Sequence, residues 1–270
     1  MGVKRLVICG GGTKGCAILG ALHGLDLQDV VAYSGVSIGS FIAFALCVGM
    51  TPKEIFEVFR DEPILSGKDW KLENLLANFG LDDGSRNTEK LQNLCEKYSG
   101  MKDPTFLQLH EYTGKELYVT ATNLTKQIPE TFSHHTTPDM SIMKSLFMSS
   151  RIPIYFTKIE HNGDLYADGM LMQSIPLTPF LDTPHEEVLV IKFTKENNPI
   201  SNTTNFMQYV GSIVDVIMIA NKIDCPFPSV TITLNEPILK LDYSKEYADT
   251  LFEIGLKTIE NEYCNGTDAC

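Results

Sequence analysis

The sequence predicts an α/β fold built around a central, mostly parallel sheet. Segments with a strand pattern alternate with segments of helical pattern along the whole chain, an order typical of parallel α/β sheets. The first of them, Arg5–Cys9, is a short apolar run, as expected of a strand that is buried on both faces. No internal repeat, low-complexity tract or linker interrupts the alternation, so we expect a single domain over residues 1–270.

The next elements are also clear from the sequence. After a glycine cluster, Thr13–Leu25 predicts a helix packed on the sheet. A second short strand is expected over Val30–Tyr33, followed by a very apolar helix over Ser40–Val48. At Thr51 the sequence TPKE supplies an N-cap, a first-turn proline and a capping-box glutamate, which predicts a helix to about Arg60.

The remaining elements follow from the same periodicities. Alternating apolar residues indicate a strand over Glu116–Thr122. Further strands are expected over Ile154–Ile159, Leu165–Ala167, Val188–Phe193 and Ser229–Leu234. Further helices are expected over Asp69–Phe79, Thr88–Tyr98, Pro138–Ser149, Asn205–Lys222 and Ser244–Glu262.

Two of these helices have more than one interpretation. Asp69–Phe79 carries Trp70 and several leucines, and Asn205–Lys222 is mostly apolar. The first fits a lid at a lipid interface, where tryptophan is favoured, and the second fits a membrane-contacting or dimer helix. Apolar residues at helical spacing more often form the core, so we expect both helices to pack inside the protein.

Composition and charge limit the possible functions. The formal net charge of −12 disfavours a nucleic-acid partner and simple electrostatic adsorption to anionic membranes. We see no signal peptide and no apolar run long enough to cross a membrane, so we expect an intracellular protein, cytoplasmic or peripheral on membranes. The seven cysteines form no C-x-x-C pair and fit a reduced chain. We expect no metal site and no cofactor.

The N-terminal glycine cluster raises the question of a nucleotide. Gly10, Gly12 and Gly15 match G-x-G-x-x-G, the pattern of dinucleotide-binding loops between a strand and a helix. That function also needs an acidic residue at the end of the second strand, where residues 32–35 have none. A phosphate-binding P-loop fails too, because Cys16 stands where lysine is required. The loop is therefore expected to bind a different negative charge.

The end of the second strand carries GVSIG, a G-x-S-x-G sequence at residues 35–39. Such a nucleophile elbow exposes a serine hydroxyl, here that of Ser37, and the amide of Ile38 at the helix start points to where an oxyanion forms. Loops that follow neighbouring parallel strands lie side by side. We therefore expect backbone N–H groups of the glycine loop to bind the same oxyanion, namely those of Gly10, Gly11 and Gly12.

Two kinds of base are compatible with Ser37. A Ser–Asp–His triad needs a histidine late in the chain; His161 and His185 lie there, but in polar loop sequences. Asp168, directly after a short predicted strand, is the alternative. A carboxylate hydrogen-bonded to the serine can take its proton without an intermediary, and partial burial raises its pKa and makes it a stronger base.

Three motifs in this order, GGGTKG, GVSIG and DG, resemble the patatin-like phospholipases. The segments TFLQLHEYTGKELYVTATNL (105–124), MSSRIPIYF (148–156) and DGMLMQSIPL (168–177) also look like segments of that family. The resemblance runs from about Val3 to Leu177 and implies a three-layer α/β/α fold with a catalytic dyad of Ser37 and Asp168. It also implies that residues 10–12 are the oxyanion loop and that Lys14 is its basic member.

The sequence departs from the family pattern at two positions. Met170 follows Gly169 where the family usually has a second glycine, and Ser174 replaces an asparagine. Both changes bear on how Asp168 is held. Arg151 lies in one of the family-like segments and has two interpretations, a ligand for a lipid phosphate or a solvated surface arginine.

We therefore expect a phospholipase A-type lipid acyl hydrolase that cleaves fatty-acyl esters of glycerophospholipids through an acyl-enzyme, without calcium. Two alternatives remain open: a general carboxylesterase or acylglycerol lipase, and a catalytically silent relative that binds lipid or protein. Because the chain is acidic, peripheral membrane contact is expected to depend on apolar insertion or on a partner. A protein activator and a homodimer are both left open.

Overall fold

The computed structural model describes residues 2–61, 70–194, 206–220, 224–234 and 243–266. Its central sheet has eight strands, in the order β10-β9-β1-β2-β4-β8-β7 with β5 also paired to β4. The strands are β1 (Arg5–Ile8), β2 (Ala32–Val36), β4 (Glu116–Asn123), β5 (Ile128–Phe132), β7 (Ile159–His161), β8 (Asp164–Ala167), β9 (Val188–Thr194) and β10 (Ser229–Thr233). The pairs from β10 through β4 are parallel, and β5, β7 and β8 are antiparallel additions.

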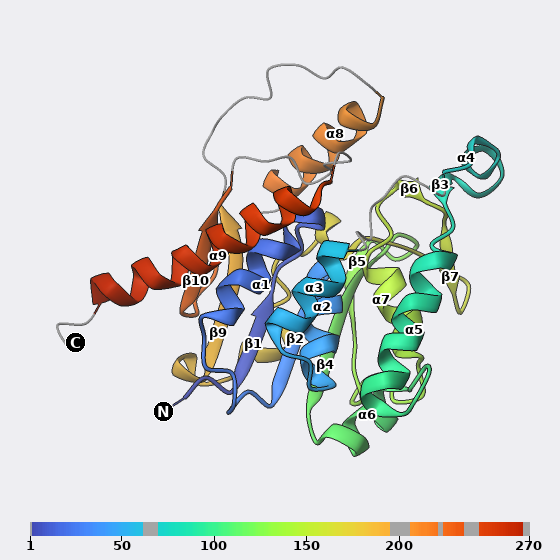
Figure 1. The fold of residues 1–270 in the computed structure, drawn as a ribbon. Helices are drawn as coiled ribbons and strands as arrows, with labels where there is room; N and C mark the ends of the chain where they lie inside the picture. The colour runs from blue at the N-terminus through green and yellow to red at the C-terminus, as the bar shows by residue number, and fades with distance from the viewer. Residues whose placement is uncertain (1, 62–69, 195–205, 221–223, 235–242, 267–270) are drawn as a thin grey trace.

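Helices flank this sheet (Figure 1). They are α1 (Gly15–His23), α2 (Ile38–Cys47), α3 (Pro52–Asp61), α4 (Leu72–Asn78), α5 (Ser85–Ser99), α6 (Phe106–Thr113), α7 (Ile142–Ser149), α8 (Phe206–Ala220) and α9 (Lys245–Gly266). α1, α2, α3 and α9 lie together over one face of the sheet, and α7 packs against β4 and β8. The predicted α/β fold with a mostly parallel sheet is thereby confirmed.

Most predicted elements form within a few residues of the expected bounds, but one strand was wrong. The run Ile154–Ile159 is divided between two sheets: β6 (Ile154–Phe156) pairs with β3 (Gly80–Asp82) in a separate two-stranded sheet, and β7 joins the main sheet. The division occurs after Phe156, where the N–H of Thr157 donates to the carbonyl of Asp82 and holds the chain on β3. β3, β5 and α6 were not expected.

The helix expected over Asp69–Phe79 is not a core helix along its whole length. Leu72 (69%) and Leu76 (81%) of α4 and Phe79 (63%) directly after it are exposed, while Trp70 and Leu75 are partly buried against the apolar cluster that includes Tyr155. The helix projects beyond the edge of the main sheet and packs beside β3 (Figure 1). Residue 69 lies outside the described residues.

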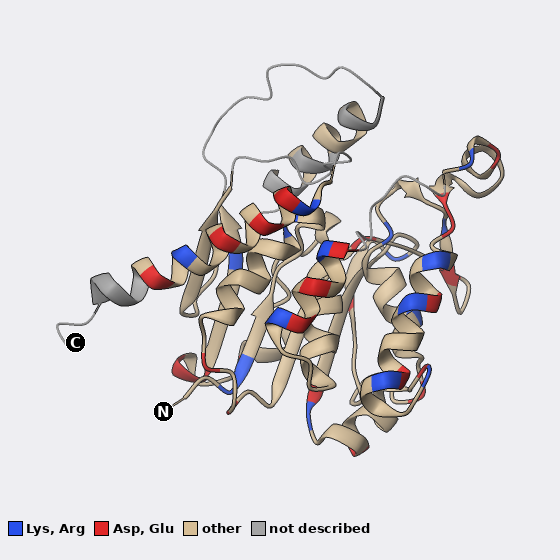
Figure 2. Cartoon of the chain, viewed as in Figure 1, with Lys and Arg blue, Asp and Glu red and all other residues tan. Residues whose placement is uncertain are grey.

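α8, within the expected helix Asn205–Lys222, is also exposed on one side. Tyr209, Ile213, Val216 and Ile217 are 37–65% exposed, whereas Val210 is buried. Residues 205, 221 and 222 lie outside the described part. Charged residues are spread over α3, α5 and α9, but the described side chains of α8 are all uncharged (Figure 2). Core packing was therefore the wrong expectation for this face. In the described ranges, no helix is both apolar enough and long enough to span a bilayer.

Two strands meet end to end along one edge of β4. β2 pairs with residues 116–120 of β4 and β8 with residues 122–123, while β5 pairs with residues 119–123. Because a strand has only two edges, β5 must occupy one of them and β2 and β8 must share the other. β8 runs antiparallel to β4 and β2 parallel to it, so the two strands end facing each other. Ser37 follows β2 and Asp168 follows β8.

Candidate active site

The turn from β2 into α2 holds Ser37 in a strained conformation. Ser37 has φ 54° and ψ −129°, a backbone geometry that residues with a side chain rarely adopt. Both flanking glycines are needed for close packing. A Cβ on Gly35 would collide with the backbone of Gly39 and Ser40, and a Cβ on Gly39 with the backbone that follows β1. The G-x-S-x-G spacing therefore has a steric cause, and the tight strand-to-helix turn predicted at Ser37 is present.

The Ser37 hydroxyl donates a hydrogen bond to Oδ2 of Asp168 at 2.6 Å. Both side chains are buried, with 3% and 1% of their surfaces exposed. Oδ1 of Asp168 accepts the N–H of Met170 at 2.9 Å. Burial raises the pKa of Asp168 from 3.8 to about 7, against the opposing effect of the hydrogen bonds from Ser37 and Met170. The carboxyl group is thus poised to exchange a proton near neutral pH.

The two histidines considered for a triad lie elsewhere in the structure. His161 is on β7 with its ring against Tyr166, and His185 packs on Phe227. The side chain that Ser37 contacts by hydrogen bond is Asp168. The geometry accordingly favours a direct carboxylate base.

Both members of the pair are held through their backbones by neighbouring hydroxyl groups. Ser149, at the end of α7, accepts the N–H of Ser37 at 2.8 Å and donates to the carbonyl of Thr120 at 2.6 Å. Thr122 donates to the carbonyl of Asp168 at 2.9 Å. Neither supporting residue was predicted from the sequence, because neither forms a spaced motif with the groups that it holds.

The glycine loop lies beside Ser37, but its amides differ in their surroundings. The N–H of Gly10 points to the carbonyl of Ser174 at 3.4 Å, so this amide, expected to bind an oxyanion, already has an acceptor. Gly12 lines the same pocket as Ser37 and Ile38. Gly12 and Ile38 are each the first residue of a helical turn, where N–H groups have no acceptor within the helix. Gly11 lies between Gly10 and Gly12 with its Cα against the Phe193 ring.

Both departures from the family pattern touch Gly10. The Met170 side chain occupies the space beside the Gly10 Cα, where a Cβ on residue 10 would overlap its sulfur. Ser174 contributes the carbonyl that accepts the Gly10 N–H. Met170 therefore shapes the glycine loop through its side chain, whereas residue 174 contacts the loop through a backbone carbonyl that any residue supplies. The Ser37–Asp168 hydrogen bond is short.

The side chains of the two basic residues considered for substrate binding, Lys14 and Arg151, contact other groups of the protein. Lys14 is buried, with its ammonium 5.7 Å from the centre of the Phe193 ring. The Arg151 guanidinium donates to the carbonyl of Asp83 and lies over the Phe156 ring, at the small β3–β6 sheet. Neither residue lines the pocket that contains Ser37. The backbone carbonyl of Arg151 instead accepts the N–H of Asp168 at 2.9 Å.

Ser37 lines a pocket formed by the described residues. Its walls are mostly apolar and come from separate parts of the chain: Gly12, Thr13, Gly15, Cys16, Ile38, Phe41, Phe59, Ser150, Ile152, Phe156 and Tyr243. The Cys16 thiol lies 3.1 Å from the Tyr243 hydroxyl, and burial raises the pKa of this thiol to about 11, so it is neutral at physiological pH. The Thr13 hydroxyl is buried and has no hydrogen-bond partner among the described residues. An uncharged, elongated ligand suits such walls.

Comparisons with a family model and with known proteins were made. A family model described as patatin-like phospholipase matches residues 6–181. A protein of Invertebrate iridescent virus 6 named "Probable lipid hydrolase 463L" is 32% identical over 256 residues, covering 90% of this chain and 83% of that protein. The uncharacterized protein R571 of Acanthamoeba polyphaga mimivirus is 28% identical over 286 residues, covering 96% and 93%.

Solved structures share the fold at low sequence identity. VipD from Legionella pneumophila superposes with a TM-score of 0.57 at 18% identity, over 96% of this chain and 67% of VipD. ExoU of Pseudomonas aeruginosa, in its heterodimeric complex with SpcU, gives a TM-score of 0.55 at 19% identity, over 99% of this chain. The match covers 52% of that ExoU chain, so this protein spans about half of its length.

Proposed function

Since the chain belongs to the patatin-like phospholipase family, we propose that it is a phospholipase A-type lipid acyl hydrolase with Ser37 as nucleophile and Asp168 as general base. The observation that carries the proposal is the 2.6 Å hydrogen bond between these side chains at an apolar pocket. The near-neutral pKa of Asp168 supports the same roles, because a base is most effective when its pKa lies near the working pH.

The reaction proceeds in two halves. Asp168 takes the Ser37 proton as the serine oxygen attacks the ester carbonyl, and the tetrahedral intermediate collapses when the departing alkoxide takes that proton. In the second half Asp168 removes a proton from water, which attacks the acyl-serine. The proton returns to Ser37 as the fatty acid leaves. No histidine is needed, since one carboxylate serves both halves.

The oxyanion is bound by backbone amides in this proposal. Ile38 begins α2, so its N–H lies at the positive end of the helix dipole, and Gly12 begins the turn before α1. Gly11 is the third donor. Gly10 has a different role: its N–H holds the loop to Ser174 while its missing side chain leaves room for Ser37 and Met170.

The pocket accommodates the fatty-acyl chain. A substitution that shortens the pocket tests this assignment: Cys16→Leu adds volume at the pocket wall beside Tyr243. We expect cleavage of long-chain p-nitrophenyl esters to fall relative to short-chain esters. Cys225→Leu, at a half-buried position that is not part of the pocket wall, is the control. An unchanged chain-length profile in Cys16→Leu contradicts the assignment.

Contact with membranes is proposed to occur through α4 and α8. Both helices lie at the end of the sheet toward which the parallel strands run (Figure 1), and both carry exposed apolar side chains, among them Leu76 and Val216. Ser37 follows β2 at the same end. Apolar insertion suits an acidic chain better than attraction to anionic lipids.

The direct test uses a fluorophosphonate probe and phospholipid vesicles. Wild type should be labelled and should release fatty acid, Ser37→Ala should do neither, and Asp168→Asn should lose at least about 100-fold in rate. Ser145→Ala and Asp164→Asn are the controls, because they make the same two kinds of substitution at residues outside the Ser37–Asp168 pair. Absence of labelling in wild type overturns the hydrolase proposal. Labelling with cleavage of soluble esters alone overturns the phospholipase part and favours a general esterase.

A further inference from the structure

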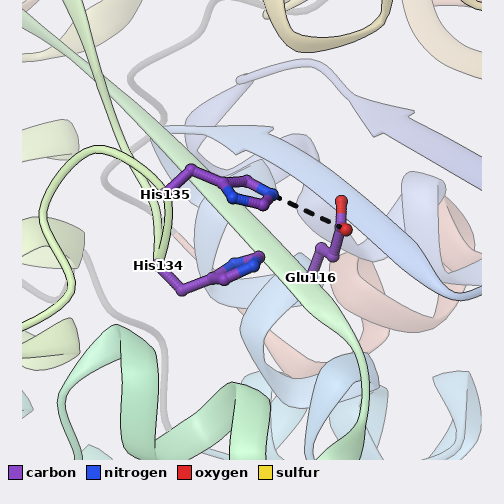
Figure 3. Close-up of side chains that lie close together, drawn as sticks. All are labelled: Glu116, His134 and His135. Carbon is purple, nitrogen blue, oxygen red and sulfur yellow. Dashed lines mark ion pairs between the residues drawn. The ribbon is translucent and has the colours of Figure 1, made fainter.

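A second cluster of reactive side chains lies at the opposite end of β4 from Asp168. Glu116 is the first residue of β4, and His134 and His135 follow β5, which is antiparallel to β4. The antiparallel pairing returns the chain to the start of β4, so the rings of His134 and His135 lie side by side and both point toward Glu116 (Figure 3). The spacing of residues 116, 134 and 135 matches no familiar metal motif, which is why the sequence analysis expected no metal site.

The ligand atoms of the three residues lie somewhat farther apart than a bound small cation requires. One ligand atom from each residue lies within 4.8 Å of the other two, and Nε2 of His135 is 3.7 Å from Oε1 of Glu116. Ligand atoms around tetrahedral zinc are roughly 3.3 Å apart, given zinc–ligand bonds of about 2.0–2.1 Å. His135 is exposed, so rotation about its side-chain bonds can close the remaining gap.

Two further observations point to a ligand. Nδ1 of His134 is buried and has no hydrogen-bond partner among the described residues. A buried ring nitrogen left in this state costs free energy, and an ion bound at Nδ1 would supply the missing partner. Glu116 is already oriented as metal-bound carboxylates are: its Oε2 accepts the hydroxyl of Tyr118 at 2.7 Å.

A third histidine, His110, packs against the cluster. The His110 ring stacks on the His134 ring with centroids 4.0 Å apart and 10° between the planes. Nδ1 of His110 lies 3.0 Å from the carbonyl of Lys115, and because a carbonyl can only accept, this nitrogen carries the proton. The hydrogen bond fixes the ring of His110, which in turn fixes the plane of His134.

We propose that Glu116, His134 and His135 form a zinc site that ties the loop after β5 to the start of β4. Two imidazoles and one carboxylate suit zinc, whereas magnesium and calcium prefer oxygen ligands alone. A fourth position is left for water. The site stabilises the fold and is independent of the proposed hydrolase chemistry, since the two lie at opposite ends of β4.

Metal titration of untagged, chelator-treated protein tests the site. We expect one Zn²⁺ per chain, a rise in the thermal midpoint with Zn²⁺, and at least about a 10-fold loss of affinity in His135→Ala and Glu116→Gln. His185→Ala, another exposed histidine, should bind as wild type does. With Co²⁺ in place of Zn²⁺, visible d–d bands should appear without a thiolate charge-transfer band.

Several results overturn the proposal. They are no Zn²⁺ binding by wild type, unchanged affinity in both His135→Ala and Glu116→Gln, or a cobalt–thiolate band that assigns the ion to cysteines. Far-UV circular dichroism must first show that the variants fold as wild type does. Fluorophosphonate labelling of His135→Ala should equal that of wild type, so a failed hydrolase proposal and a failed zinc proposal are distinguishable.

Discussion

The sulfur of Met170 fills the space that a side chain on Gly10 would need. Met170 also donates its N–H to Oδ1 of Asp168, so one residue contacts both the glycine loop and the carboxyl group that pairs with Ser37. Gly10 in turn lies so close to Ser37 that a Cβ on residue 10 would be 3.1 Å from the serine Cβ. These four residues are packed as a unit, so substitutions among them should not be additive.

A double-mutant cycle measures this packing. Gly10→Ala forces a methyl group into the Met170 side chain, and overpacking of this kind costs about 1–3 kcal/mol in the free energy of unfolding. The same substitution should cost distinctly less in a Met170→Ala background, where the colliding atoms are absent. Urea unfolding of the four proteins gives the coupling free energy. Equal costs in both backgrounds would show that Met170 does not oppose a side chain at position 10.

Ser149→Ala should impair the site without touching the reacting atoms. The substitution leaves the N–H of Ser37 without its acceptor and the carbonyl of Thr120 without its donor, both in a buried region. Each unsatisfied buried group costs about 1–3 kcal/mol, and the strained turn at Ser37 loses one of its restraints. We expect lower stability and at least a 10-fold slower reaction with the fluorophosphonate.

The matched control is Ser145→Ala in the same helix. Ser145 is equally buried, but its hydroxyl donates to the carbonyl of Ile142 within its own turn. Its loss should slow labelling by less than about 2-fold, since no contact with Ser37 changes. If both variants slow labelling equally, the effect of Ser149 is general destabilisation and not positioning.

An element of the fold could be predicted from the sequence when its own residues define it, and could not when contacts with distant parts of the chain define it. β1, β2, β4, β9 and β10 are apolar or alternating runs, and the sequence predicted each of them. β5 contains Pro129 and Glu130 and is half exposed, so it has no strand pattern of its own and forms because β4 offers a free edge. β3 and β6 are three-residue strands that pair only with each other.

The residues of the candidate site also differ in whether local or long-range contacts define them. Ser37 lies between two glycines in a short motif, and Asp168 lies in another. Neighbouring residues determine the conformation of each motif, so both residues could be predicted from the sequence. Ser149 and Thr122 act through backbone groups of residues far away in the chain. The family resemblance gave Lys14 as the basic member of the glycine loop, and in the structure its ammonium lies over the Phe193 ring on β9.

Membrane binding should depend on the exposed apolar side chains of α4 and α8. Leu76→Asp and Val216→Asp each place a charge where we propose contact with the lipid interior, and the two residues are 81% and 65% exposed. We expect weaker sedimentation with phosphatidylcholine vesicles and slower vesicle hydrolysis, with hydrolysis of soluble esters unchanged. Val31→Asp is the control: Val31 is 49% exposed but precedes β2, at the other end of the sheet. Equal loss of sedimentation in Val31→Asp would locate membrane contact elsewhere.

Activity should rise with pH through the pKa of Asp168. The proposed base works only when ionised, and burial raises its pKa from 3.8 to about 7. The rate of ester hydrolysis, as kcat/KM, should therefore be low at pH 5 and level off above about pH 8. A rate that is already constant between pH 5 and pH 8 would mean that the carboxylate is ionised throughout.

The raised pKa of Asp168 should also make the free energy of unfolding depend on pH. Between pH 3.8 and about 7 the folded protein keeps the proton on Asp168 while the unfolded chain has released it, so this group lowers stability as pH rises. The cost is fully developed above pH 7, where it amounts to about 4 kcal/mol, and it is relieved as pH falls toward 4. Asp168→Asn removes the charge, so it should be more stable than wild type at pH 8 by several degrees in the thermal midpoint, with the difference shrinking toward pH 4. Asp164→Asn supplies the contrast, because the Lys126 ammonium and the Asn123 amide hold the pKa of Asp164 below its ordinary value and its loss should not stabilise the fold at any pH. A pH-independent difference between Asp168→Asn and wild type would show that the buried carboxyl group is not the source.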